Sequence, residues 1–73
     1  MVRLPIVSGK EASRAFEKIG FVYRRTVGSH MMYKRPGART LSIPNHKELD
    51  LGLLKRLISE VGITPEEFIA LLG

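Results

Sequence analysis

Apolar residues recur along this chain with two different spacings, and the change from one to the other predicts the order of its elements. Near the N-terminus, four apolar residues are spaced as on one face of a helix: Ala12, Ala15, Phe16 and Ile19. Ser8 and Glu11 form the Ser-x-x-Glu pattern of a capping box, in which each side chain satisfies a backbone amide of the first turn. Gly20 stands where a left-handed residue ends a helix. The pattern therefore predicts a helix over residues 9–19.

After Gly20 the spacing changes to that of strands. Residues 21–27, 30–35 and 39–43 are rich in aromatic and β-branched side chains and predict an antiparallel meander. Gly28-Ser29 suits a two-residue type II′ hairpin turn, and Pro36-Gly37 marks a second turn. Strict alternation would place four side chains of the first strand on one face: Phe21, Tyr23, Arg25 and Val27. The apolar run Met31-Met32-Tyr33 does not reveal which face of the second strand is buried, so the orientation of His30 stays open.

The C-terminal third returns to helical spacing. Asp50 is a good N-cap, Gly62 ends the element, and the apolar face between them consists of Leu53, Leu54, Leu57, Ile58 and Val61. Thr64 begins a last short helix as its N-cap, with Pro65 at the first helical position. The N-terminal residues 3–7, interrupted by Pro5, are expected to pack along an edge and not to form a central strand.

The predicted order is α-β-β-β-α-α, which is an α+β fold in one domain over residues 1–73. A three-stranded antiparallel sheet is only marginally stable alone, so the helices must cover one of its faces. The other face is left to meet a partner.

Positive charge is concentrated in the middle of the chain. The net charge is +5 at pH 7, and no Asp or Glu lies between residues 18 and 47, whereas the basic residues there are Lys18, Arg24, Arg25, Lys34, Arg35, Arg39 and Lys47. This distribution favours a partner of negative potential, most often nucleic acid. The alternative is a generic basic surface that aids solubility.

The sequence also bears on compartment. It contains no Cys, so neither a disulfide nor a thiolate metal site is available. No apolar run approaches the roughly 18 residues needed to cross a bilayer, and the N-terminus lacks the apolar region of a signal peptide. We expect a cytoplasmic protein without a membrane partner.

His30 follows the Gly28-Ser29 turn at the centre of the basic region. A histidine in a strand is more often structural, but one that is exposed beside a turn and surrounded by cations suits metal-free RNA cleavage. A base takes the proton of the 2′-hydroxyl, an acid protonates the leaving 5′ oxygen, and cations stabilise the phosphorane. We therefore expect His30 to be catalytic. The residues expected to bind RNA are Arg24, Arg25, Ser29, Lys34, Arg35, Arg39 and His46.

No metal or other cofactor is expected. His46 lies in a loop, where it is either an ordinary solvent-exposed residue, a phosphate contact or the acid partner of His30. Two histidines without Cys and without a ligand spacing do not predict a zinc site. The carboxylates lie at helix starts or on exposed helical positions, where capping and the helix dipole account for them.

Short motifs in a fixed order resemble the HicA toxin family of the HicAB toxin–antitoxin systems over nearly the whole chain. The matching pieces are Leu4-Pro5 with Ser8-Gly9-Lys10-Glu11, Glu17-Lys18-Ile19-Gly20-Phe21, Gly28-Ser29-His30, Arg35-Pro36-Gly37, Ile43-Pro44-Asn45-His46, and the segment from Gly52 to Ile63. One departure is Leu53, which stands where family members often have a threonine after the glycine.

The resemblance implies a fold similar to a double-stranded-RNA-binding domain and a small ribonuclease that cleaves mRNA. It implies that the histidine of the Gly-Ser-His motif, here His30, is catalytic, and that a HicB antitoxin binds and blocks the toxin. Ordinary domains of that fold contact duplex phosphates with lysines at the start of a C-terminal helix. Here that place carries Glu48 and Asp50, which argues against duplex binding in the usual mode.

Three hypotheses follow for the function. The first is an endoribonuclease toxin, or mRNA interferase, that uses His30. The second is a non-catalytic RNA-binding module. The third is a protein-interaction domain whose basic face meets an acidic partner.

Overall fold

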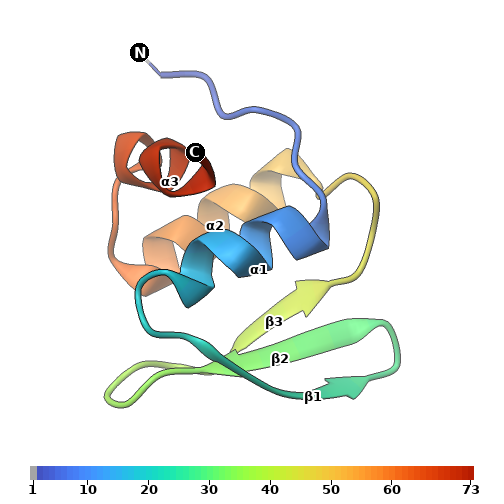
Figure 1. Ribbon diagram of the computed structural model, residues 1–73. Coiled ribbons are helices and arrows are strands. Elements are labelled where there is room, and N and C mark those ends of the chain that lie inside the picture. Colours follow the sequence, from blue (N-terminus) through green and yellow to red (C-terminus); the bar gives the residue numbers. More distant parts are fainter. Residues whose placement is uncertain (1) are drawn as a thin grey trace.

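The computed structural model, which describes residues 2–73, contains a three-stranded antiparallel sheet and three helices. The elements are α1 (Gly9–Glu17), β1 (Val22–Val27), β2 (His30–Lys34), β3 (Leu41–Pro44), α2 (Leu51–Val61) and α3 (Pro65–Leu72). The strand order is β1-β2-β3, and all three helices lie on the same side of the sheet (Figure 1). The predicted α+β class and the order α-β-β-β-α-α are confirmed.

The core lies between this helical layer and the inner face of β2 and β3. Phe16 of α1 and Phe68 of α3 are fully buried, and their ring centroids are 5.4 Å apart. The strands contribute five buried side chains: Met31, Tyr33, Leu41, Ile43 and Pro44. In contrast, every residue of β1 is exposed, because β1 is the edge strand farthest from the helices (Figure 1). The helices therefore anchor β2 and β3, and β1 is held mainly by its pairing with β2.

Both predicted turns use glycine in the left-handed region. Val27 pairs with His30, Gly28 has φ 62°, and Ser29 keeps a negative φ, which is the type II′ geometry expected for a two-residue hairpin. In the second turn, Gly37 has φ 77° and the amide of Ala38 donates to the carbonyl of Arg35 at 3.1 Å. Proline followed by a left-handed glycine is the type II arrangement.

A β-bulge in β1 overturns the predicted alternation of that strand. The pairing register shifts between Tyr23, which is opposite Tyr33, and Arg25, which is opposite Met32. The extra residue, Arg24, interrupts the two-residue period, so Tyr23 lies on the helical side of the sheet while Arg25 lies on the uncovered side. The prediction that these two residues share a face is wrong, because period-2 patterning does not register an inserted residue.

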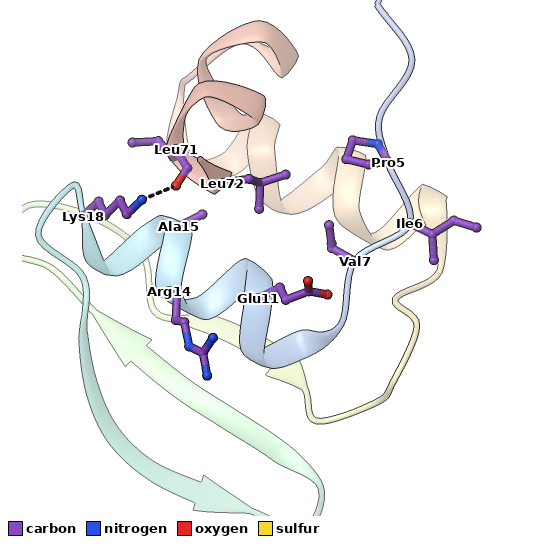
Figure 2. A pocket seen from close by; sticks show the side chains of 9 residues that line it. All are labelled: Pro5, Ile6, Val7, Glu11, Arg14, Ala15, Lys18, Leu71 and Leu72. Atoms are coloured by element: carbon purple, nitrogen blue, oxygen red, sulfur yellow. Dashed lines mark hydrogen bonds between the residues drawn. The ribbon is translucent and has the colours of Figure 1, made fainter.

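The N-terminal segment forms no strand in residues 2–8, as expected, but it does not follow an edge of the sheet. It runs over the helices, where Val7 is buried and its carbonyl accepts a hydrogen bond from the amide of Leu49 at 2.8 Å. Figure 2 shows Val7 before the start of α1 and, at the other end of this helix, the C-cap residue Lys18, which donates to the carbonyl of Leu71 at 2.7 Å. The N-terminal segment thus packs against the helices and is held there by the burial of Val7 and its hydrogen bond with Leu49.

The capping box predicted at the start of α1 is present. The amide of Glu11 donates to the hydroxyl of Ser8 at 3.0 Å, and the amide of Ser8 donates to the carboxylate of Glu11 at 2.8 Å. The hydrogen bond from the Ser8 amide, followed by that with its side chain, lowers the pKa of Glu11 below its usual value. The ionised carboxylate is therefore the form that the fold stabilises.

This lowered pKa predicts an acid-dependent loss of stability. A carboxyl with a lower pKa in the folded state contributes stability above its unfolded pKa, and this contribution is lost as the pH falls through the folded value. Glu11→Gln is expected to lower the free energy of unfolding near neutral pH and to match the parent protein once the pH is below the lowered pKa of Glu11. Urea unfolding across this range measures the difference. A penalty of equal size at every pH would contradict the assignment.

Candidate nucleic-acid interface

The structure decides which face of the sheet carries His30. Along β2, Met31 and Tyr33 are buried against the helices, so His30, Met32 and Lys34 lie on the opposite, uncovered face. His30 itself is exposed at the start of the strand, directly after the Gly28-Ser29 turn. The orientation that the sequence did not decide is therefore settled: His30 lies on the sheet face that the helices do not cover. We call this face, which carries His30, Met32 and Lys34, the open face.

A shallow hollow on the open face gathers three of the predicted RNA-binding side chains. It has a volume of about 220 Å³ and is lined by Arg24, Arg25, Met32, Lys34 and Thr40. The bulge in β1 brings two consecutive arginines to it, and Lys34 reaches it from β2. Met32, which lines the hollow, is the next residue of β2 after His30 on this face, because alternate residues of a strand share a face. Three cations around one hollow suit a phosphate group.

The turn before His30 is tied to the segment that follows β3. The amide of Asn45 donates to the carbonyl of Ser29 at 2.8 Å, and the amide of Gly9 donates to the carbonyl of His46 at 2.9 Å. His30 is the pairing partner of Pro44. The fold thus brings Ser29, His30 and the backbone of His46 to one end of the sheet, and the side chains of all three are exposed.

Arg35 lies apart from this group. Its guanidinium donates to the carbonyl of Ile19 at 2.9 Å and stands 4.6 Å from the ring centroid of Phe21, so the side chain is half-buried against the end of α1. These contacts satisfy a free carbonyl after the helix and add a cation–π interaction. Arg39 is exposed in the segment before β3 and does not line the hollow.

The contacts of Arg35 predict that it stabilises the fold. Arg35→Ala is expected to lower the free energy of unfolding by about 1–3 kcal/mol, since it removes a charge-assisted hydrogen bond and a cation–π contact. Arg39→Ala, which removes the same charge from an exposed position, should leave the stability within about 0.5 kcal/mol of the parent. Chemical denaturation of the two variants checks this. Equal stabilities would show that the observed contacts of Arg35 contribute nothing.

The helical side carries a different surface. Figure 2 shows a pocket between residues 5–7, α1 and α3; its volume is about 330 Å³, and none of the predicted site residues lines it.

Within residues 2–73, no three His, Cys, Asp or Glu side chains gather where they could bind a metal ion. Among the helices of this same range, none has the length and apolar character required to cross a membrane.

Sequence reasoning missed two members of the hollow, Met32 and Thr40. Both are uncharged, so a search for basic residues does not find them. Met32 could have been proposed only with a rule for choosing between the two neighbouring methionines. The burial of Met31 supplies that choice, and it depends on where the helices pack.

Together, fold and site define a class of protein: a small α+β domain that presents a histidine and a basic hollow on the uncovered face of a three-stranded sheet. The chain belongs to the HicA toxin family, since residues 9–63 match the family model described as the HicA toxin of bacterial toxin–antitoxin. Membership implies that the protein is paired with an antitoxin. No curated protein matches the chain in sequence. The matched range begins at α1 and includes His30 and every residue that lines the hollow.

Proposed function

We propose that this toxin is a metal-independent endoribonuclease that cleaves mRNA, with His30 as general base or general acid. The observation that carries the proposal is the exposure of His30 on the open face, beside a hollow lined by Arg24, Arg25 and Lys34. Imidazole is the side chain best suited to proton transfer near neutral pH. Cations within a few residues of it suit the bound phosphates and the charge that develops during cleavage.

In the proposed reaction, His30 accepts the proton of a ribose 2′-hydroxyl as the 2′ oxygen forms a bond to the adjacent phosphorus. The bond from phosphorus to the 5′ oxygen breaks, and that oxygen takes a proton from a general acid. The products are a 2′,3′-cyclic phosphate and a 5′-hydroxyl. Solvent or the imidazole of His46 could donate the proton, because the fold brings both histidine segments to the same end of the sheet.

The test is cleavage of single-stranded RNA by the purified protein in the presence of EDTA. We expect cleavage to continue when metals are chelated and the new ends to be 2′,3′-cyclic phosphate and 5′-hydroxyl. Ends that carry a 5′-phosphate would contradict attack by the 2′ oxygen. Loss of all cleavage on chelation, with recovery on added magnesium, would contradict a metal-independent reaction.

Non-catalytic RNA binding is the second candidate, and the hollow favours it as much as the first, because three cations bind phosphate whether or not a bond is broken.

Both candidates predict an affinity for RNA that falls as the salt concentration rises. Lys34→Ala is expected to reduce the slope of log affinity against log salt by about 0.7, the value for one contact to single-stranded nucleic acid. Filter binding at several salt concentrations measures it, and an unchanged slope would remove Lys34 from the interface. Intact RNA after long incubation with wild-type protein would favour the second candidate.

The antitoxin partner is proposed to be HicB-like. Its binding is expected to prevent cleavage, and the open face is the surface whose charge suits an acidic protein as well as RNA. Co-expression with a neighbouring HicB-like reading frame tests this. Continued growth arrest despite formation of a complex would contradict inhibition.

A further inference from the structure

A groove on the other side of β1 is not accounted for by the proposed function. It lies between α1 and the β1–β2 hairpin, has a volume of about 370 Å³, and is lined by residues that include Lys10, Arg14 and Glu17 of α1, Tyr23 and Tyr33 of the strands, and Asn45. We propose that this groove binds a base of single-stranded RNA several nucleotides from the cleaved phosphate, with Tyr23 as its stacking platform. The inference rests on the proposed ribonuclease function and adds to it a substrate-binding residue.

The bulge in β1 creates this aromatic wall. Because the register shifts at Arg24, Tyr23 lies on the helical side, where its side chain remains 47% exposed. Its ring contacts that of Tyr33 edge to face with centroids 5.7 Å apart, and its hydroxyl shares a hydrogen bond of 2.7 Å with the hydroxyl of Thr26. A ring that is fixed at both ends and half exposed is preorganised to stack on a base, and such stacking tolerates any base.

The opposite wall of the groove supplies charge and polar groups. Lys10 and Arg14 are exposed and four residues apart on α1, so they share a face of the helix. Arg14 lines both this groove and the pocket between α1 and α3, and Figure 2 shows its guanidinium extending from α1 on the side of the sheet. Among the charged residues that line the groove, Lys10 and Arg14 outnumber Glu17, and Arg14 also interacts with the carboxylate of Glu11 outside it. The side-chain amide of Asn45 and the carboxylate of Glu17 can pair with base edges.

The groove is connected through Asn45 to the turn that precedes His30. Asn45, which lines the groove, donates its backbone amide to the carbonyl of Ser29 at 2.8 Å, and Ser29 precedes His30 in the turn. Because Tyr23 and His30 lie on opposite faces of the sheet, an RNA strand that passes around this end would place one base in the groove and a phosphate several nucleotides away beside His30. Double-stranded RNA does not fit this arrangement, because its bases are stacked and paired. The geometry therefore points to single-stranded RNA.

The experiment uses His30→Ala as a parent that is not expected to cleave, and a short fluorescein-labelled single-stranded RNA as the probe. Fluorescence anisotropy is measured for the parent, for the parent with Tyr23→Ala and for the parent with Tyr23→Phe. We expect Tyr23→Ala to weaken binding roughly tenfold and Tyr23→Phe to bind as the parent does, since the ring is retained. An abasic ribose-phosphate oligomer of the same length should show no difference between the three.

Matched controls distinguish a loss of RNA binding at the groove from a loss caused by unfolding or by a lower net charge. Arg14→Ala should weaken RNA binding more than Arg56→Ala, which removes an exposed arginine from α2 outside the groove. Circular dichroism and thermal unfolding establish that each variant is folded, and a Tyr23→Ala variant that fails to fold is replaced by Tyr23→Leu, which keeps apolar bulk without a stacking ring.

The outcomes distinguish this inference from the function on which it rests. If the parent binds RNA and the variant without the ring binds it equally well, the groove is not a base site and only this inference fails. The same holds if loss of the Tyr23 ring weakens binding of an acidic antitoxin but not of RNA, since the groove is then a protein contact. If the parent binds no RNA and wild-type protein cleaves none, the proposed ribonuclease function fails with it.

Discussion

His30→Ala is expected to reduce RNA cleavage by about a hundredfold to ten-thousandfold, the range typical of a lost general acid or base. The same variant should no longer arrest growth when it is expressed without an antitoxin. The physical reason is that alanine cannot accept or donate the proton, while the basic hollow that binds phosphate remains intact. Because His30 is exposed on a strand end, its removal leaves no buried cavity, and the free energy of unfolding should stay within about 0.5 kcal/mol of the wild type.

The matched control for this experiment is His46→Ala, which removes the same side chain from an exposed loop at the same end of the sheet. If His46 serves only as a phosphate contact, its loss should weaken binding and leave the turnover of bound RNA close to normal. A defect as large as that of His30→Ala would make His46 the acid partner. Normal cleavage by His30→Ala, with folding confirmed, would show that the proposed mechanism is wrong.

Gly9→Ala is expected to destabilise the protein by about 2–4 kcal/mol, within the range for steric overpacking and larger than most single substitutions. A β-carbon at this position would lie 2.0 Å from the carbonyl oxygen of Pro44, which is a backbone atom and cannot move without β3. The amide of Gly9 also donates to the carbonyl of His46, so the clash falls where α1 holds the segment that contacts the Ser29 turn. Cleavage is therefore expected to fall together with stability.

Gly52→Ala provides the control for this prediction. It makes the same substitution near the start of a helix, but its β-carbon would meet only the side-chain oxygen of Asp50, at 3.1 Å. Alanine has a higher helix propensity than glycine by up to about 1 kcal/mol, so this variant should be near neutral or slightly more stable. Thermal and denaturant unfolding compare the two. Equal effects would indicate that close packing against Pro44 does not explain the glycine at position 9.

Local chemistry explains why much of the fold could be predicted from the sequence. Ser8 with Glu11, and Thr64 with Glu67, specify helix starts through hydrogen bonds between residues three apart. Gly28 specifies its hairpin because a left-handed φ is required there. These interactions involve neighbours in the chain, and for that reason sequence patterns record them.

The candidate site was predictable only in part. His30 and the basic residues could be named from their position after a turn and their common charge. Which arginines face a substrate could not be predicted. The side chain of Arg35 packs against Ile19 and Phe21, and these contacts form only in the folded protein. The sequence shows which residues are charged, but it does not show on which surface of the folded protein each charge lies.

By itself, therefore, the sequence determined the order of the elements, their caps and turns, and the histidine that is most worth testing. Only the tertiary structure decided which face of β2 is buried, since this depends on where three helices pack across the sheet. It also decided that the bulge at Arg24 sends Tyr23 to one face and Arg25 to the other. The physical reason is that register and layer packing arise between segments far apart in the chain, whose pairing no local pattern encodes.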